Sequence, residues 1–295
     1  MDKPAIEFVE ELYSKEEIEK MVTQFQEKGY VILPDVFKRE TVDPFVKQLE
    51  EIMIFDGLKN TIPHNSPHYI HCAYTPRARQ VLPYTLSHLN SKPYPCLNTT
   101  IIIIQKDGDT SYIPEWHKDH SPEGMPGKEY YYPSTVFLAF YFEDMTDEHG
   151  PTLTIPGTHR DLSIYPVDKN SYADVAVIPD NDDKKLPVEA IHCRKQDAVL
   201  LDQRIWHRGT ARKAPGTRYI FVYGAYPIAH FYGTVTHMPE SQLHAWIHAK
   251  NMKDRVFFGG YFAPPDREAL KAMEKELDEL EKAGGPVREF LRAAY

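Results

Sequence analysis

The chain has 295 residues, of which 42% are hydrophobic and 26% are charged, a composition typical of globular proteins. Its formal net charge of −9 argues against nucleic acid or an anionic membrane as the main partner, and no stretch reaches the roughly 18 apolar residues of a membrane span. Three cysteines without a CxxC pair, and an acidic N-terminal stretch without the apolar core of a signal peptide, argue against a disulfide framework and predict a cytoplasmic location.

The N-terminal third of the chain has the pattern of helices. The stretch 14–33, SKEEIEKMVTQFQEKGYVIL, predicts a helix that begins with a capping box and ends at Gly29, followed by a short strand. The stretch 38–55 and residues 81–90 predict two further helices. Residues 58–80 are polar, with Pro and His scattered through them, and we expect them to form a loop.

From about residue 97 the pattern changes to short runs of β-branched and aromatic residues that Gly, Pro and Asp interrupt. Such runs are typical of successive β-strands rather than of alternating βα units. Together with the helical flank they predict a mainly β protein with α-helices, folded as a double-stranded β-helix, a jelly-roll or cupin-like barrel. The runs are LNTTIIIIQ (97–105), STVFLAFYF (134–142), GPTLTIPG (150–157), AVLLD (198–202) and RYIFVYGAY (218–226).

No linker or internal repeat divides the chain, so we expect one domain over residues 1–295. Its parts are a helical N-terminal flank over about 1–95, the barrel over about 96–235, and a C-terminal helical extension over about 236–295. The extension contains an amphipathic helix from about residue 266, whose simplest interpretation is a surface or dimer-contact helix.

The stretch EWHKDH, residues 115–120, is the first candidate for chemistry. A helical pairing of His117 with His120 is disfavoured by prolines on both sides, and the HExxH motif of zinc proteases is absent from the chain. In an extended segment, residues two apart share a face, so His117 and Asp119 could bind one metal while Lys118 points the other way. Two ligands do not make a site, and a third must come from elsewhere.

His207 is the histidine whose context best fits a third ligand, because it lies beside Trp206 after an apolar run. Taken alone, it could equally be a hydrogen-bonded core residue. Eleven residues later Arg218 begins a run of buried character, and a buried arginine is costly unless it is paired. It could bind either one of the 43 acidic residues or a co-substrate with a carboxylate at its end.

The order of these motifs resembles the phytanoyl-CoA dioxygenase-like branch of the Fe(II)/2-oxoglutarate oxygenases over residues 15–235. His117-x-Asp119 comes first, then GPTLTIPGTHR (150–160), then His207 eleven residues before Arg218. The resemblance implies that the two histidines and Asp119 bind Fe(II), and that Arg218 pairs with the distal carboxylate of 2-oxoglutarate. It also implies reaction with O₂, release of succinate and CO₂, and oxygenation or desaturation rather than halogenation, because related halogenases lack the carboxylate.

Further residues are assigned to the site on weaker grounds. Gln105 and Thr135 are predicted to bind the keto acid or the substrate, although Thr135 could simply favour a strand. Four residues near the metal motifs are candidates for substrate binding, with packing or solvation as the alternative: Trp116, His120, Tyr131 and Arg208. His159 is an alternative metal ligand, but its place after the turn at Pro156-Gly157 favours a structural role.

We therefore predict an oxygenase that hydroxylates or desaturates an unactivated C–H bond of a small molecule, such as a secondary metabolite or an amino-acid-like compound. Its cofactors would be Fe(II), 2-oxoglutarate and O₂, and it would act as a monomer or homodimer without nucleic-acid or membrane partners. Two alternatives remain open: a non-catalytic jelly-roll module that binds a small molecule, and a cupin-type metal-dependent hydrolase or isomerase.

Overall fold

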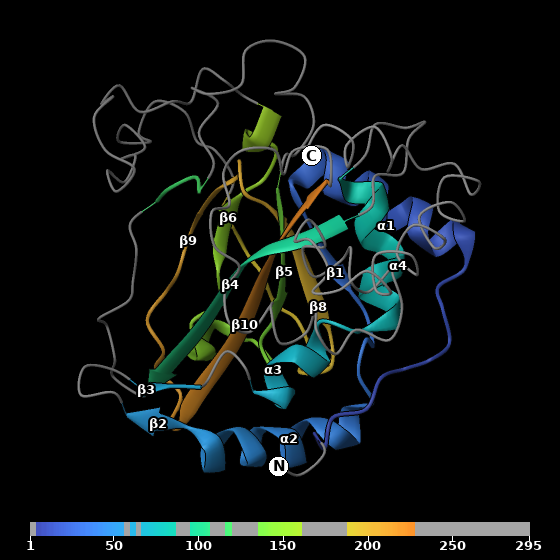
Figure 1. The fold of residues 1–295 in the computed structure, drawn as a ribbon. Coiled ribbons are helices and arrows are strands. Elements are labelled where there is room, and N and C mark those ends of the chain that lie inside the picture. Colours follow the sequence, from blue (N-terminus) through green and yellow to red (C-terminus); the bar gives the residue numbers. More distant parts are fainter. Residues whose placement is uncertain are drawn as a thin grey trace, which may run out of the picture.

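Two antiparallel sheets form the centre of this computed structural model, which describes residues 4–55, 60–62, 66–86, 95–106, 116–119, 135–160 and 188–227 (Figure 1). The larger sheet has the strand order β1-β8-β5-β10-β4 and the smaller one β7-β6-β9. The two sheets confirm the predicted double-stranded β-helix, and each of the five predicted runs contains a strand. The strands are β1 (Tyr30–Leu33), β4 (Pro95–Lys106), β5 (Val136–Phe140), β6 (Leu153–Ile155), β7 (Glu189–Ala190), β8 (Ala198–Asp202), β9 (Trp206–Arg208) and β10 (Thr217–Pro227).

The first helix, α1 (Lys15–Lys28), confirms the prediction from the capping box. The Ser14 side chain accepts a hydrogen bond from the Glu17 amide, and the Glu17 carboxylate accepts one from the Ser14 amide. The helix ends at Gly29, whose φ of +85° lies in the left-handed region that glycine adopts at low cost. The chain then enters β1 directly, as predicted.

The second predicted helix is confirmed as α2 (Arg39–Ile52), but the region after it differs from the prediction. Strands β2 (Ile54–Phe55) and β3 (Asn60–Thr61) pair with each other, and two helices follow, α3 (Pro67–Cys72) and α4 (Pro76–Thr85). The expected loop over 58–80 is therefore wrong, and the helix expected at 81–90 begins earlier. Proline is well tolerated in the first turn of a helix, so the prolines taken as loop signals instead mark where α3 and α4 begin.

Alternating side chains of β10 separate the two hydrophobic clusters of the fold. Tyr219, Phe221 and Tyr223 belong to the cluster that the helices cover, and the ring of Tyr69 in α3 stacks on Tyr223 with centroids 4.6 Å apart. Ile220 and Val222 point to the other side and belong to the second cluster, which includes Val199 and Leu201 of β8. Arg218 has the same parity as Ile220 and Val222, so the strand carries its guanidinium into the barrel.

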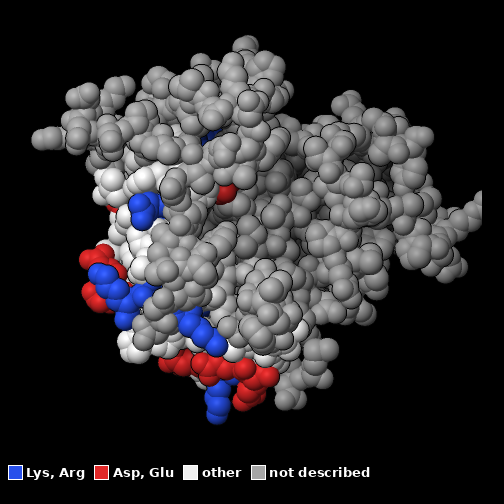
Figure 2. All heavy atoms as spheres, turned by 90° about the vertical axis from the view of Figure 1, so that its left-hand side faces the viewer, with Lys and Arg blue, Asp and Glu red and all other residues white. Residues whose placement is uncertain are grey.

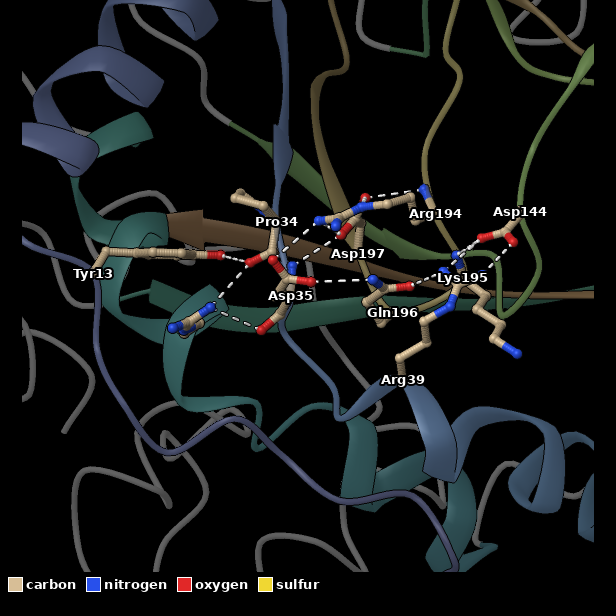
Figure 3. A network of polar contacts seen from close by, with 10 residues as sticks. Tyr13, Pro34, Asp35, Arg39, Asp144, Arg194, Lys195, Gln196 and Asp197 are labelled. Carbon is tan, nitrogen blue, oxygen red and sulfur yellow. Dashed lines mark hydrogen bonds and ion pairs between the residues drawn. The ribbon is translucent and has the colours of Figure 1, made fainter.

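A network of charged side chains joins the end of β1 to the segment before β8 (Figure 3). Arg194 pairs with Asp197 at 2.8 Å and with Asp35 at 3.1 Å. The Asp197 carboxylate also accepts the Asp35 amide at 2.9 Å, and Arg39 of α2 pairs with Asp144 at 2.6 Å. Each of these charges has a partner of opposite sign.

The surface of the described residues mixes both signs of charge. On the face drawn in Figure 2, acidic and basic side chains lie next to each other along its lower part, so this part of the molecule presents no extended basic patch for nucleic acid. Among the described helices, none is long and apolar enough to cross a membrane.

Candidate metal centre

His117 and His207 face each other across an isolated antiparallel β-bridge. The amide nitrogen of each donates to the carbonyl oxygen of the other, both at 3.0 Å. On its other side His207 is paired with Thr154 of β6. Directly paired residues project their side chains to the same face of a sheet, and the two imidazole rings lie with centroids 4.3 Å apart.

Asp119 brings its carboxylate to both histidines. One carboxylate oxygen lies 3.5 Å from Nε2 of His117 and the other 3.1 Å from Nε2 of His207. One ligand atom from each of the three residues lies within 4.8 Å of the others. Two imidazole nitrogens and one carboxylate oxygen are the donor set of the facial triad, which binds Fe(II) and leaves positions open for other ligands.

The ring of His207 is oriented for metal binding by its own backbone. Its Nδ1 lies 3.0 Å from the carbonyl oxygen of Ile205, which can only accept, so Nδ1 carries the proton and Nε2 offers its lone pair. Burial works against a charged ring here, but the Asp119 carboxylate and the Ile205 carbonyl together outweigh burial and raise the pKa of His207 above its ordinary value.

Lys118 points away from the triad, as alternation predicts. Its Nζ donates to the carbonyl oxygen of Thr158 at 2.7 Å and lies 5.5 Å from the centre of the Trp206 ring. The positive charge of Lys118 therefore lies on the side of residues 117–119 that faces away from the triad, and it does not compete with a metal ion for the triad.

Arg218 lies inside the barrel with 5% of its surface exposed. It stands directly opposite Gln105 in the β10–β4 register, and its Nη2 donates to the Gln105 side-chain oxygen. Nη1 donates to the carbonyl oxygens of His149, at 3.0 Å, and Gly150. Nε is buried without a hydrogen-bond partner, and no described acidic residue forms an ion pair with this guanidinium.

Burial lowers the pKa of Arg218 from its ordinary value, because the guanidinium loses its hydration, and the opposing influence of Tyr141 and Glu143 does not make up for this loss. The ion pair that was the alternative explanation for this arginine is not found among the described residues. A guanidinium in this state matches a carboxylate in charge and in planar hydrogen-bonding geometry.

Thr135 does not lie beside Arg218. It immediately precedes β5, where Val136 pairs with Ala225, so the two residues lie near opposite ends of β10. Ala225 follows Arg218 by seven residues, so at the usual rise of about 3.3 Å per residue the separation along the strand is roughly 23 Å. The Thr135 hydroxyl is buried without a partner, but it cannot reach a carboxylate held by Arg218, and we leave it out of the co-substrate site.

Two of the four candidate substrate residues contact each other. The Arg208 guanidinium lies over the Trp116 ring at 6.0 Å from its centre, a cation–π arrangement. Each is next in sequence to a metal histidine, so alternation places both on the face away from the triad. His120 and Tyr131 lie outside the described residues.

His159 is not part of the cluster of three metal-ligating residues. Its ring is buried and Nε2 lies 3.0 Å from the carbonyl oxygen of Gln26, which supports the structural role. Sequence reasoning also missed the partly buried pair of Arg212 with Glu143, at 2.6 Å, both of which act electrostatically on Arg218. Neither contact has a sequence signal, because both join segments far apart in the chain.

Comparisons with known proteins agree with this geometry. The sequence profile of the phytanoyl-CoA dioxygenase (PhyH) family matches residues 25–220. Among curated proteins, none matches the chain in sequence.

Solved structures share the fold at low sequence identity. The epimerase SnoN, in complex with Fe³⁺, α-ketoglutarate and nogalamycin RO, is 15% identical over 73% of this chain and 85% of SnoN, with a TM-score of 0.56. The carbocyclase SnoK from nogalamycin biosynthesis is 19% identical over the same shares, with a TM-score of 0.54. HygX from Streptomyces hygroscopicus, with nickel and 2-oxoglutarate bound, is 17% identical over 74% of this chain and 88% of HygX, with a TM-score of 0.51.

Proposed function

This chain belongs to the phytanoyl-CoA dioxygenase family of Fe(II)/2-oxoglutarate-dependent oxygenases, and from that premise we propose that it oxidises an unactivated C–H bond of a small organic molecule. His117, Asp119 and His207 would hold the iron, and Arg218 would bind the distal carboxylate of 2-oxoglutarate. One observation carries the proposal: a cluster of three ligand atoms within 4.8 Å occurs in one barrel with a buried arginine that has no acidic partner among the described residues.

The residues fit both groups. A two-histidine, one-carboxylate set leaves coordination positions open, which a keto acid and O₂ need. The Arg218 guanidinium matches a carboxylate in charge and planar shape, and its buried Nε still lacks an acceptor. A zinc hydrolase would need the metal but not the arginine, so the pair of features favours the oxygenase over the hydrolase or isomerase alternative.

Bound iron with 2-oxoglutarate and O₂ supplies an oxidant for an unactivated C–H bond, with release of succinate and CO₂. The protein's contribution is orientation and charge. The Ile205 carbonyl fixes the His207 ring, and Gln105 fixes the Arg218 guanidinium from the opposite strand. Asp119 contributes the negative charge, and its presence favours oxygenation or desaturation over halogenation.

The proposed substrate is a small molecule of the kind met in natural-product tailoring. SnoN and SnoK, which share the fold, belong to nogalamycin biosynthesis, which supports this substrate class. We propose hydroxylation or desaturation as the outcome, and mass spectrometry of the product separates the two. Hydroxylation adds one oxygen atom, whereas desaturation removes two hydrogens.

The decisive experiment is an anaerobic titration of the metal-free protein with Fe(II) and 2-oxoglutarate. We expect a charge-transfer absorption band that requires both, because the keto acid chelates iron held in the triad. A jelly-roll binding module would show no iron binding and no band. A hydrolase or isomerase would bind a metal but turn over without O₂ and without forming succinate.

A further inference from the structure

The turn at residues 156–160 contacts the end of α1. The Gly157 amide donates to the Lys28 carbonyl at 3.0 Å, and Nε2 of His159 lies 3.0 Å from the carbonyl oxygen of Gln26. The last carbonyls of a helix lack partners within the helix and must find them elsewhere. The turn supplies those partners, so its position is fixed by the helical layer.

Thr158, in the middle of this turn, makes three further hydrogen bonds. Its hydroxyl accepts the Trp206 amide at 3.0 Å and donates to the Ile155 carbonyl at 2.7 Å. Its own carbonyl oxygen accepts the Lys118 ammonium at 2.7 Å. Thr158 and Trp206 are 2% and 1% exposed, so water cannot replace the hydroxyl.

These contacts reach the immediate neighbours of all three metal-ligating residues. Lys118 separates His117 from Asp119, and Trp206 precedes His207. Thr158 therefore touches both ligand segments at once, one through its carbonyl oxygen and the other through its hydroxyl. The Lys118 ammonium also lies over the Trp206 ring, with Nζ 5.5 Å from the ring centre.

We propose that Thr158 is a positioning residue of the metal centre, which holds the segment of His117 and Asp119 in register with the segment of His207. The inference rests on the proposed function, because it assumes that these three residues bind the metal. It assigns the turn at residues 156–160 a role in positioning the metal ligands, in addition to reversing the chain. Residues that orient the ligands of a metal typically change its affinity by about 10- to 100-fold when replaced.

The test compares Thr158→Val, which keeps the shape and removes the hydroxyl, with Thr158→Ser, which keeps the hydroxyl. The dissociation constant for Fe(II) is measured anaerobically, without 2-oxoglutarate or turnover. We expect Thr158→Val to weaken Fe(II) binding by at least about tenfold and Thr158→Ser to stay close to the original protein. Thr85→Val is the matched control, because its buried hydroxyl donates to the Leu82 carbonyl in α4, far from the ligand segments in sequence.

A merely structural role would lower the melting temperature of Thr158→Val and Thr85→Val alike and leave Fe(II) affinity equal in both. That result overturns the proposal. Lys118→Met and Lys118→Arg provide a second test that does not depend on a buried site, since Lys118 is only half-buried. We expect the methionine variant to weaken Fe(II) binding and the arginine variant to retain it.

The outcomes separate this inference from the proposed function. If the unaltered protein binds no Fe(II), the proposed function fails. If it binds Fe(II) and both Thr158→Val and Lys118→Met bind it equally well, the metal centre stands and only the positioning role is wrong.

Discussion

Arg194 and Arg218 are two arginines of the same barrel with opposite surroundings. Arg194 contacts the carboxylates of Asp197 and Asp35 in the network of Figure 3, and the hydrogen bonds to Asp197 contribute most to raising its pKa. Arg218 contacts a side-chain amide and two backbone carbonyls, and burial lowers its pKa. The first arginine is paired with carboxylates within the fold, whereas the second has no ion pair with a described acidic residue and is proposed to bind the carboxylate of 2-oxoglutarate.

The contrast separates charges that stabilise the protein from charges kept for a ligand. A buried ion pair whose partners are both present is costly to break from either side, by about 3–5 kcal/mol when fully buried. A buried cation without its partner destabilises the fold and persists only where function requires it. Pairs of variants, one from each region, can therefore test the assignment.

The largest effects are expected when Asp119→Ala is compared with Asp197→Ala, the first in Fe(II) affinity and the second in stability. Asp119 is accessible to solvent and contacts two histidines, so its removal should cost more than about 100-fold in Fe(II) affinity with little change in melting temperature. Asp197 is 4% exposed and accepts hydrogen bonds from the backbone amides of Asp35 and Arg194, so its removal should cost roughly 2–3 kcal/mol of stability, because two backbone amides lose their acceptor. Calorimetry and anaerobic Fe(II) titration measure both. Equal Fe(II) binding by Asp119→Ala would remove this residue from the triad.

The buried ring of His159 predicts how the stability of the protein depends on pH. Burial is the main cause that lowers its pKa to about 4; Asp202 and the Gln26 carbonyl oppose this shift, whereas Arg204 and Arg160 add to it. Its Nδ1 has no hydrogen-bond partner. The unfolded histidine titrates near 6.5. The neutral His159 ring therefore makes its full contribution to the free energy of unfolding above pH 6.5. This contribution is lost as the pH falls toward 4, and the loss is about 2 to 3 kcal/mol at pH 4.5.

The measurement is urea unfolding of the metal-free protein at pH 7 and pH 4.5, for the original chain and His159→Gln. The glutamine amide can still donate to the Gln26 carbonyl but cannot take up a proton. We expect the variant to lose less stability on acidification. An identical loss in both proteins would show that other groups govern the acid response.

Arg218→Ala and Arg194→Ala should have opposite consequences. Loss of a charge-assisted hydrogen bond of about 1.5–3 kcal/mol predicts an apparent KM for 2-oxoglutarate raised about 10- to 100-fold in Arg218→Ala, with Fe(II) affinity retained. Arg194→Ala should lower stability by about 1 kcal/mol, because the residue is half exposed, and should leave this KM unchanged. An unchanged KM in Arg218→Ala would mean that another residue holds the distal carboxylate.

The sequence predicted the metal ligands because their chemistry depends on residue type and on local spacing. Alternation in an extended segment was enough to place His117 and Asp119 on one face, and the motif order supplied His207. Helix α3 was not predicted and α4 begins earlier than predicted, because the prolines and histidines of residues 58–80 are locally typical of a polar loop, yet His68 is buried in the fold.

Strand register and long-range contacts could not be predicted. Thr135 was assigned to the co-substrate because it was expected on a neighbouring strand. Only the pairing of Val136 with Ala225 shows that it lies near the end of β10 opposite to Arg218. Thr158 has no signal of its own for the same reason: its partners come from segments 40 and 48 residues away. A single sequence shows which residues could act, and the fold decides which of them meet.

The smallest expected effect comes from Gln105→Glu, which would turn the unpaired arginine into a paired one. Gln105 already stands opposite Arg218, and its side-chain oxygen accepts a hydrogen bond from Nη2. A glutamate at this position can therefore form an ion pair with Arg218 without a change in the position of either side chain. The internal carboxylate would compete with 2-oxoglutarate for the guanidinium. We expect an apparent KM for 2-oxoglutarate raised about fivefold to tenfold, equivalent to about 1 kcal/mol, together with a higher melting temperature of the metal-free protein.

Gln105→Leu is the matched control, because it removes the hydrogen bond without adding a charge. It should lower the melting temperature and change the KM for 2-oxoglutarate by less than about threefold. Stability and co-substrate affinity therefore move in opposite directions only in the glutamate variant. If Gln105→Glu leaves the KM unchanged while it stabilises the protein, Arg218 forms an ordinary structural ion pair there, and the contrast with Arg194 no longer identifies a co-substrate site.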